Sequence, residues 1–251
     1  MQEIKSLQRA ISVLEELHKE KRPLSLSELH RNLGLSKTSL VRILGTLEKA
    51  GFVERNEDSL KYSLGLKMLL LGSEVYKGIT NNKSIMPFLE GIRDDSGETV
   101  IVNLLNDDKR VCVECVEAKK SVRIVPYIGQ TAYLYSGASG KVILAFFSDE
   151  EIEDYLNRVP LKKIGPNTII NKELLWEEIR KIRKDGYAIS NGELEKDYLS
   201  VSAPLFSSNK TPFGSISIVA VAALTDQSIT RFASLVKYGS ERLSILMNPF
   251  N

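Results

Sequence analysis

The sequence is poor in the side chains that enzymes commonly use for proton transfer and metal binding. Its 251 residues include two histidines, two cysteines and one tryptophan. Both histidines, His18 and His30, lie near the N-terminus, so a Ser–His or Cys–His pair within the rest of the chain is excluded. Cys112 and Cys115 have Cys-x-x-Cys spacing, but a zinc site needs further ligands and none lies nearby in the sequence. We therefore expect no catalysis, no metal and no cofactor.

Long apolar runs and a strong charge of one sign are also absent. No run of about 18 uncharged apolar residues occurs, and the N-terminus has no apolar signal-peptide core, so we expect a soluble cytoplasmic protein. The formal net charge is +2, and residues 1–64 carry 11 Lys and Arg against 9 Asp and Glu. A domain with so small a positive charge would bind nucleic acid through a few specifically positioned hydrogen-bond donors, with more than one copy of the domain at each site. This balance favours an oligomer.

Residues 25–47 have the pattern of two helices joined by a glycine turn. Ser25 with Glu28 forms a capping box, Gly34 suits a left-handed helix end, and Ser36 caps the second helix. Leucine and isoleucine recur at helical spacing on the inward face of both helices. The outward side chains near the start of the second helix are small hydroxyls, cations and one valine: Lys37, Thr38, Ser39, Val41 and Arg42. Such a surface is typical of a helix that enters the major groove.

The flanking segments complete a winged helix-turn-helix DNA-binding domain over residues 1–64. Apolar residues on either side of a polar tip at 56–59 predict two short strands, which would form the wing. Upstream, five apolar residues predict a first helix that closes the small core: Ile4, Leu7, Ile11, Leu14 and Leu17.

A second region begins after residue 64. A strongly apolar segment predicts a linker helix over 65–81 that packs on the first domain and on a partner chain; the alternative is an ordinary core helix. Residues 82–251 have an α+β pattern, with strands predicted at 98–105, 110–116, 122–125, 201–206 and 213–223 between helices. In the second strand, Cys112 and Cys115 would point to opposite faces as structural residues, because side chains alternate along a strand. A sheet with helices packed against it would hold a concave pocket.

Short motifs, in order, resemble the IclR family of bacterial transcriptional regulators. The resemblance spans about residues 5–247 and rests on residues 5–10, 35–39 with Arg42, 51–53, 62–65, 96–100, 139–141, 185–188 and 202–204. It implies an α+β chain with an N-terminal winged helix-turn-helix, a linker helix and a C-terminal GAF-like α/β domain with a central antiparallel sheet. It also implies a homodimer or dimer of dimers that binds operator DNA, more often as a repressor, under control of a small organic acid or aromatic effector.

The resemblance assigns two sets of site residues. DNA contacts carry over to Ser36, Lys37, Thr38, Ser39 and Arg42, and we add Arg55 and Lys61 in the wing as phosphate or minor-groove contacts. The effector pocket carries over to Ile128, Tyr133, Leu134, Ala138, Ser139, Gly140, Ser190, Ser200 and Ser217. Free amides at the helix start in 137–140 would suit a carboxylate.

Three departures from the family pattern predict a different ligand. Ser190 stands where an acidic residue is common, Ser200 stands where a cysteine is common, and residues 133–136 lack the histidine that many members carry. A second class of function also stays open: a GAF-like sensor or enzyme whose N-terminal helices only mediate oligomerisation. Lys37 and Arg42 discriminate between the two, because a DNA reader exposes them and an oligomerisation module buries them against a partner.

Overall fold

A computed structural model describes residues 3–80, 83–221 and 225–247. The chain divides into two compact units, Met1–Gly78 and Ile79–Asn251. The boundaries predicted at 64 and 81 stay predictions, and residues 81 and 82 lie outside the described part. Within that part, no helix is long and apolar enough to cross a membrane.

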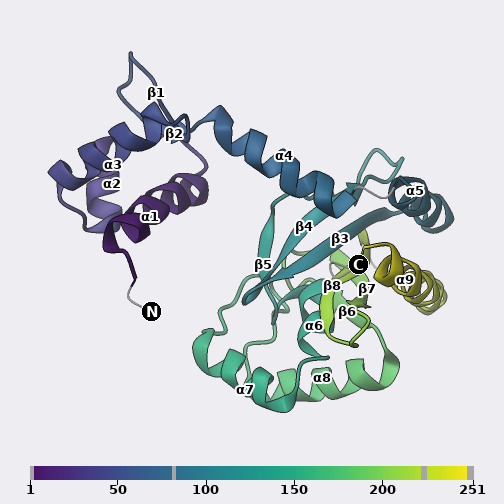
Figure 1. Ribbon diagram of the computed structural model, residues 1–251. Coiled ribbons are helices and arrows are strands. Elements are labelled where there is room, and N and C mark those ends of the chain that lie inside the picture. The colour runs from purple at the N-terminus through teal and green to yellow at the C-terminus, as the bar shows by residue number, and fades with distance from the viewer. Residues whose placement is uncertain (1–2, 81–82, 222–224, 248–251) are drawn as a thin grey trace. The chain divides into compact units, whose positions relative to one another are not determined.

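The first unit is a winged helix-turn-helix, as predicted. It contains α1 (Lys5–Glu20), α2 (Leu26–Leu33), α3 (Lys37–Lys49), β1 (Val53–Arg55), β2 (Tyr62–Leu64) and most of α4 (Leu66–Thr80) (Figure 1). The two strands pair antiparallel and form the wing. A single apolar core joins the first three helices to the wing through Val13, Leu17, Leu24, Leu29, Leu40, Leu44, Val53 and Tyr62.

Local capping fixes the turn between α2 and α3. The Ser25 hydroxyl accepts a hydrogen bond from the Glu28 amide, and the Glu28 carboxylate accepts one in return from the Ser25 amide. Gly34 ends α2 at φ 66°, and the Ser36 hydroxyl accepts from the Ser39 amide at the start of α3. Both predicted caps are therefore present.

The prediction for the inward face of α1 was largely wrong. Ile4, Leu7 and Ile11 are 66%, 57% and 46% exposed, whereas Val13 and Leu17 enter the core. The sequence allowed both assignments, because α1 carries two apolar rows at helical spacing and only one faces α2 and α3.

The apolar side chains of α4 do not pack on the first unit as predicted. Leu66, Leu69, Leu70, Leu71 and Val75 are all more than half exposed. The helix begins against the wing instead. Its Lys67 ammonium lies 5.3 Å from the Phe52 ring centroid.

The second unit is built on a six-stranded antiparallel sheet in the order β5-β4-β3-β8-β7-β6 (Figure 1). The strands are β3 (Thr99–Asn106), β4 (Lys109–Val116), β5 (Thr131–Tyr133), β6 (Ala188–Asn191), β7 (Tyr198–Phe206) and β8 (Pro212–Val221). The helices are α5 (Ile85–Ser96), α6 (Gly137–Leu144), α7 (Asp149–Arg158), α8 (Lys172–Asp185) and α9 (Asp226–Leu246). One apolar core joins the sheet to α5 and α9, and another gathers α6, α7 and α8.

Two sheet predictions need correction. Residues 122–125 form no strand. Val122 and Val125 are at least half exposed and only Ile124 is buried, so the segment does not bury a row of side chains as a strand of this sheet would. The edge strand on the side of β4 away from β3 is instead β5. The short strand β6 had not been predicted, and the predicted end of the last strand, at 223, lies outside the described residues.

A β-bulge in β4 changes the faces of the two cysteines. Val102 pairs with Glu114 but Asn103 pairs with Cys112, so Val113 is the extra residue. Cys115 and Cys112 lie opposite Ile101 and Asn103, which are two positions apart on β3 and share a face. The predicted opposite orientation was therefore wrong. Burial raises the thiol pKa values of Cys112 and Cys115 to about 11 and 12.

Candidate DNA-binding and effector sites

The start of α3 presents an exposed polar surface. Ser36, Lys37, Thr38 and Arg42 are exposed, and Ser39 is half-buried beside the cap. Neither Lys37 nor Arg42 forms an ion pair with any described residue. Exposed donors on a rigid, capped helix can reach base edges and phosphates without first breaking a contact within the chain.

The wing places two more cations at its strands. Arg55 on β1 is exposed and its guanidinium lies 5.6 Å from the Tyr62 ring centroid, whereas Lys61 before β2 is half-buried. Stacking on the ring limits the motion of the Arg55 side chain and leaves its donors free to contact a phosphate.

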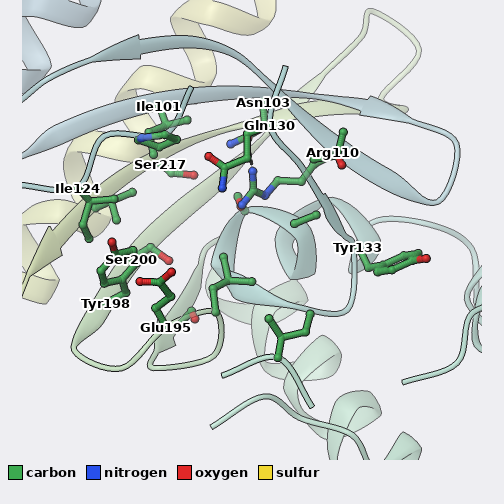
Figure 2. A pocket seen from close by; sticks show the side chains of 18 of the residues that line it. Ile101, Asn103, Arg110, Ile124, Gln130, Tyr133, Glu195, Tyr198, Ser200 and Ser217 are labelled. Carbon is green, nitrogen blue, oxygen red and sulfur yellow. Dashed lines mark hydrogen bonds between the residues drawn. The ribbon is translucent and has the colours of Figure 1, made fainter. Parts of the chain in front are cut away.

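A cavity of about 510 Å³ lies in the second unit, on the sheet face that carries α6. Five of the predicted effector residues line it: Tyr133, Ser139, Ser190, Ser200 and Ser217. The Ser217 hydroxyl accepts a hydrogen bond of 2.8 Å from Ser202, which fixes it on the sheet. Tyr133 forms part of the wall, but its ring points away from the other labelled side chains (Figure 2).

The other four predicted residues do not line this cavity. Leu134, before α6, and Ala138, in α6, are fully buried in the core that this helix shares with α7 and α8, and Ile128 is 49% exposed on the loop before β5. Gly140 is a packing position, since a Cβ atom there would lie 2.7 Å from the Leu134 carbonyl oxygen.

The structure adds polar residues that the sequence argument had missed. Asn103, Arg110 and Gln130 lie together on one side of the cavity, and Glu195 and Tyr198 lie near Ser200 on another (Figure 2). The sequence signal was the interruption of two apolar strands by Asn103 and Arg110. The bulge in β4 is needed to bring these two side chains to one face of the sheet, and no local sequence pattern predicts that bulge.

Arg110 is the buried cation of the cavity. Only 7% of the residue is exposed, and its Nη1 donates a 2.7 Å hydrogen bond to Asn103 Oδ1. Among the described residues it has no ion pair, and its Nε has no hydrogen-bond partner. Burial lowers the pKa of the guanidinium to about 10, so it remains charged at neutral pH.

The start of α6 is already occupied by a carboxylate. Glu193 Oε2 accepts from the Gly137 amide at 3.1 Å, and Glu193 Oε1 lies 2.6 Å from the buried Lys141 Nζ. Lys141 also pairs with Glu178 at 2.8 Å. The group therefore has two carboxylates around one ammonium, which makes this end of the cavity unfavourable for another anion.

The opposite polar group contains an acid and a phenol. Glu195 is exposed at the cavity, and Tyr198 is half-buried beside it. Burial and then the Glu195 carboxylate raise the pKa of Tyr198, which keeps its hydroxyl protonated as a donor. This side can hydrogen-bond a polar ligand group but repels negative charge.

Elsewhere in the described chain, no group of three or more His, Cys, Asp or Glu side chains is placed to hold a metal ion. Both histidines are exposed in the first unit. His30 Nδ1 lies 2.7 Å from the Leu35 carbonyl oxygen in the turn before α3, a structural contact.

Comparison with known proteins identifies the chain. Residues 6–57 match the IclR helix-turn-helix domain, and residues 77–245 match the family described as bacterial transcriptional regulator IclR C-terminal. The HTH-type transcriptional regulator KipR of Bacillus subtilis is 33% identical over 91% of this chain and 90% of its own length. These relatives are transcriptional regulators and not enzymes.

Solved structures agree in fold. An IclR transcriptional regulator from Alicyclobacillus acidocaldarius superposes with a TM-score of 0.84 at 26% identity, covering 98% of this chain and 100% of that one. An IclR homologue from Microbacterium hydrocarbonoxydans, complexed with 4-hydroxybenzoate, has a TM-score of 0.78 at 19% identity, covering 96% of this chain and 99% of the other. The chain therefore belongs to the IclR family of transcriptional regulators, with a helix-turn-helix unit for DNA and a C-terminal unit for a small-molecule effector.

Proposed function

We propose that a homodimer or dimer of dimers of this chain represses transcription in the cytoplasm, with one recognition helix per half-site and one effector per cavity. The observation that carries the DNA half of the proposal is the exposed, unpaired surface of Lys37 and Arg42 on α3. In this reading, Arg42 contacts a guanine edge or a phosphate. Ser36, Lys37, Thr38, Ser39, Arg55 and Lys61 contact mainly phosphates.

The oligomer is supported by apolar surface on the first unit. Exposed apolar side chains form one row along α1 and its N-cap and two rows on opposite sides of α4, where a monomer would leave them in water: Ile4, Leu7, Ile11, Leu66, Leu69, Leu70, Leu71 and Val75. A second copy that covers these rows would also supply the second recognition helix that a weakly basic DNA-binding domain needs for sufficient affinity.

The effector half rests on the cavity in the second unit. Tyr133, Ser139, Ser190, Ser200 and Ser217 are its proposed effector-binding residues, and a cavity of about 510 Å³ fits a small organic acid or aromatic. The complex of a structural neighbour with 4-hydroxybenzoate favours this size class. The effector would act by binding the DNA-competent and DNA-incompetent states with different affinities.

Genomic fragment capture tests the proposal. Purified full-length protein is mixed with fragmented host chromosome at two salt concentrations, beside Arg42→Ala and a control, Lys49→Ala. Lys49 is an exposed cation at the other end of α3, so its loss changes the charge equally without touching the proposed reading surface.

We expect the wild type and Lys49→Ala to enrich the same discrete sites. Arg42→Ala should lose affinity by about 1–3 kcal/mol, which is roughly 5- to 150-fold. Equal binding by all three proteins, or enrichment of no discrete site, would refute the assignment of α3 as the reading helix.

A further inference from the structure

We infer that the cavity of the second unit selects a small monocarboxylate whose acid group binds the Nε and Nη2 edge of Arg110, on the β3–β4 side and not at the start of α6. This inference rests on the proposed function of the cavity as the effector site. It adds the orientation of the ligand in the cavity and names Arg110 as the residue that selects a negatively charged ligand.

The free edge of the guanidinium determines the chemistry. Nη1 is used by Asn103, whereas neither Nε nor Nη2 has a partner among the described residues. The N–H bonds of Nε and Nη2 run parallel, and they match the two oxygens of a carboxylate in a bidentate pair. A neutral ligand group would leave the charge of this buried fork uncompensated.

Burial explains why an anion is favoured so strongly here. Arg110 lies on the inner face of β4 at 7% exposure, with no described carboxylate as its ion-pair partner. A nearby hydroxyl, Ser215 Oγ, is also buried without a partner; Ser215 pairs across the strands with Asn103. Among the described residues, the two buried side-chain nitrogen or oxygen atoms without a hydrogen-bond partner, Arg110 Nε and Ser215 Oγ, therefore both belong to neighbours of Asn103.

The other polar parts of the cavity disfavour an acid group. The Gly137 amide at the start of α6 is bonded to Glu193, in a group with one excess negative charge. Glu195 adds a further carboxylate near Ser200 and Tyr198 (Figure 2). With Arg110 and Glu195 as the charged residues among those described as lining the cavity, a single negative charge fits, and hydroxyls suit the far end.

The test measures the Arg110 side chain directly. Full-length protein labelled with nitrogen-15 is titrated with sodium acetate, and the Arg110 Nε–H signal is assigned by its loss in Arg110→Lys. Acetamide, which has the same shape without the charge, and inorganic phosphate are titrated in parallel at equal ionic strength. Arg110→Gln removes the fork, and Arg180→Gln removes an exposed cation of α8 as the matched control.

We expect acetate to shift the Nε–H signal saturably, acetamide to leave it unchanged, and phosphate to act more weakly than acetate. Arg110→Gln should bind acetate at least tenfold more weakly, while Arg180→Gln should respond as the wild type does. Butyrate should bind more tightly than succinate, because the second carboxylate of succinate meets the negative end of the cavity.

Several results would overturn the inference. These are an unshifted Nε–H signal, an equal response to acetamide, tighter phosphate or succinate binding, or acetate shifts centred on the Ser139 amide. If Arg110→Gln does not fold, the wild-type comparison of acetate with acetamide still decides. Fragment capture without acetate reports on DNA binding alone, so failure of the regulator proposal is seen separately.

Discussion

Glu28 joins the turn before α2 to the first turn of that helix through three charge-assisted hydrogen bonds. Its carboxylate accepts from the Ser25 amide and hydroxyl, both at 2.8 Å, and from Arg22 Nη1 at 2.7 Å. The hydrogen bond from the Ser25 amide makes the largest contribution to lowering the pKa of Glu28 to about 2, and the hydrogen bond from Arg22 makes the next largest. A single side chain therefore links the stability of the DNA-binding unit to pH.

The sign of this linkage follows from the lowered pKa. The folded state favours the ionised carboxylate, so the stabilisation is complete above the ordinary pKa of 4.5 and is lost as the pH falls toward 2. Calorimetry of the full chain should show a gap in melting temperature between wild type and Glu28→Gln at pH 6 that narrows by pH 3. Glu57→Gln, in the exposed wing tip, serves as the control and should show no such gap. A gap that widens in acid would contradict this account.

At the scale of elements, α6 packs so closely on the segment before it that one position admits no side chain. A Cβ atom on Gly140 would lie 2.7 Å from the Leu134 carbonyl oxygen and 2.9 Å from that of Tyr133. Both contacts are with backbone, which cannot move aside without shifting a helix that lines the cavity.

We therefore expect Gly140→Ala to lower the free energy of unfolding by about 1–3 kcal/mol. Gly91→Ala is the matched control, because Gly91 is exposed in α5 and an added Cβ atom there would meet nothing within 4 Å beyond its own helix. This variant should gain up to about 1 kcal/mol from helix propensity. Chemical denaturation of the full-length variants measures both. Equal stability of the two variants would show that α6 can shift freely.

The elements differ in how far the sequence could predict them. Ser25, Gly34 and Ser36 determine their turns through contacts within a few residues, so the helix-turn-helix could be derived locally. The helix α1 was predicted correctly, but most of its predicted inward face was wrong because either apolar row could face the core. The bulge at Val113 depends on pairing between β3 and β4, and the position of Arg110 depends on the bulge. The serines of the cavity were found by resemblance to the family, whereas the cation was not.

At the scale of the whole molecule, the proposed function uses more than one copy of the first unit. Its charge is small, and its exposed apolar rows on α1 and α4 are too extensive for an isolated surface helix. A charged residue within such a row should destabilise a dimer far more than it destabilises the fold of one chain, because the position is already exposed to solvent in a single copy.

Leu69→Glu should accordingly produce a folded monomer, whereas the wild type has at least twice the mass of one chain in solution. Leu60→Glu is the control, since Leu60 is 54% exposed in the wing and lies outside all of these rows. Light scattering after size-exclusion chromatography measures the mass. Operator affinity should fall at least roughly 100-fold in Leu69→Glu, through the loss of simultaneous contact with two half-sites. A wild-type monomer, or an unchanged mass in Leu69→Glu, would refute the two-copy arrangement.

The extra residue in β4 has a consequence for how effector preference can change between genes. Strand side chains alternate, so regular pairing of Val113 with β3, without the bulge, would turn Arg110 and Cys112 away from the cavity and toward the face covered by α5 and α9. The positive charge would leave the binding site although every residue lining it kept its identity. Loss of the bulge with Val113 retained could thus remove the proposed preference for an acid, whereas deletion of Val113 itself would restore regular alternation and keep Arg110 at the cavity. The strand pairing of this hairpin therefore carries information that residue types alone do not.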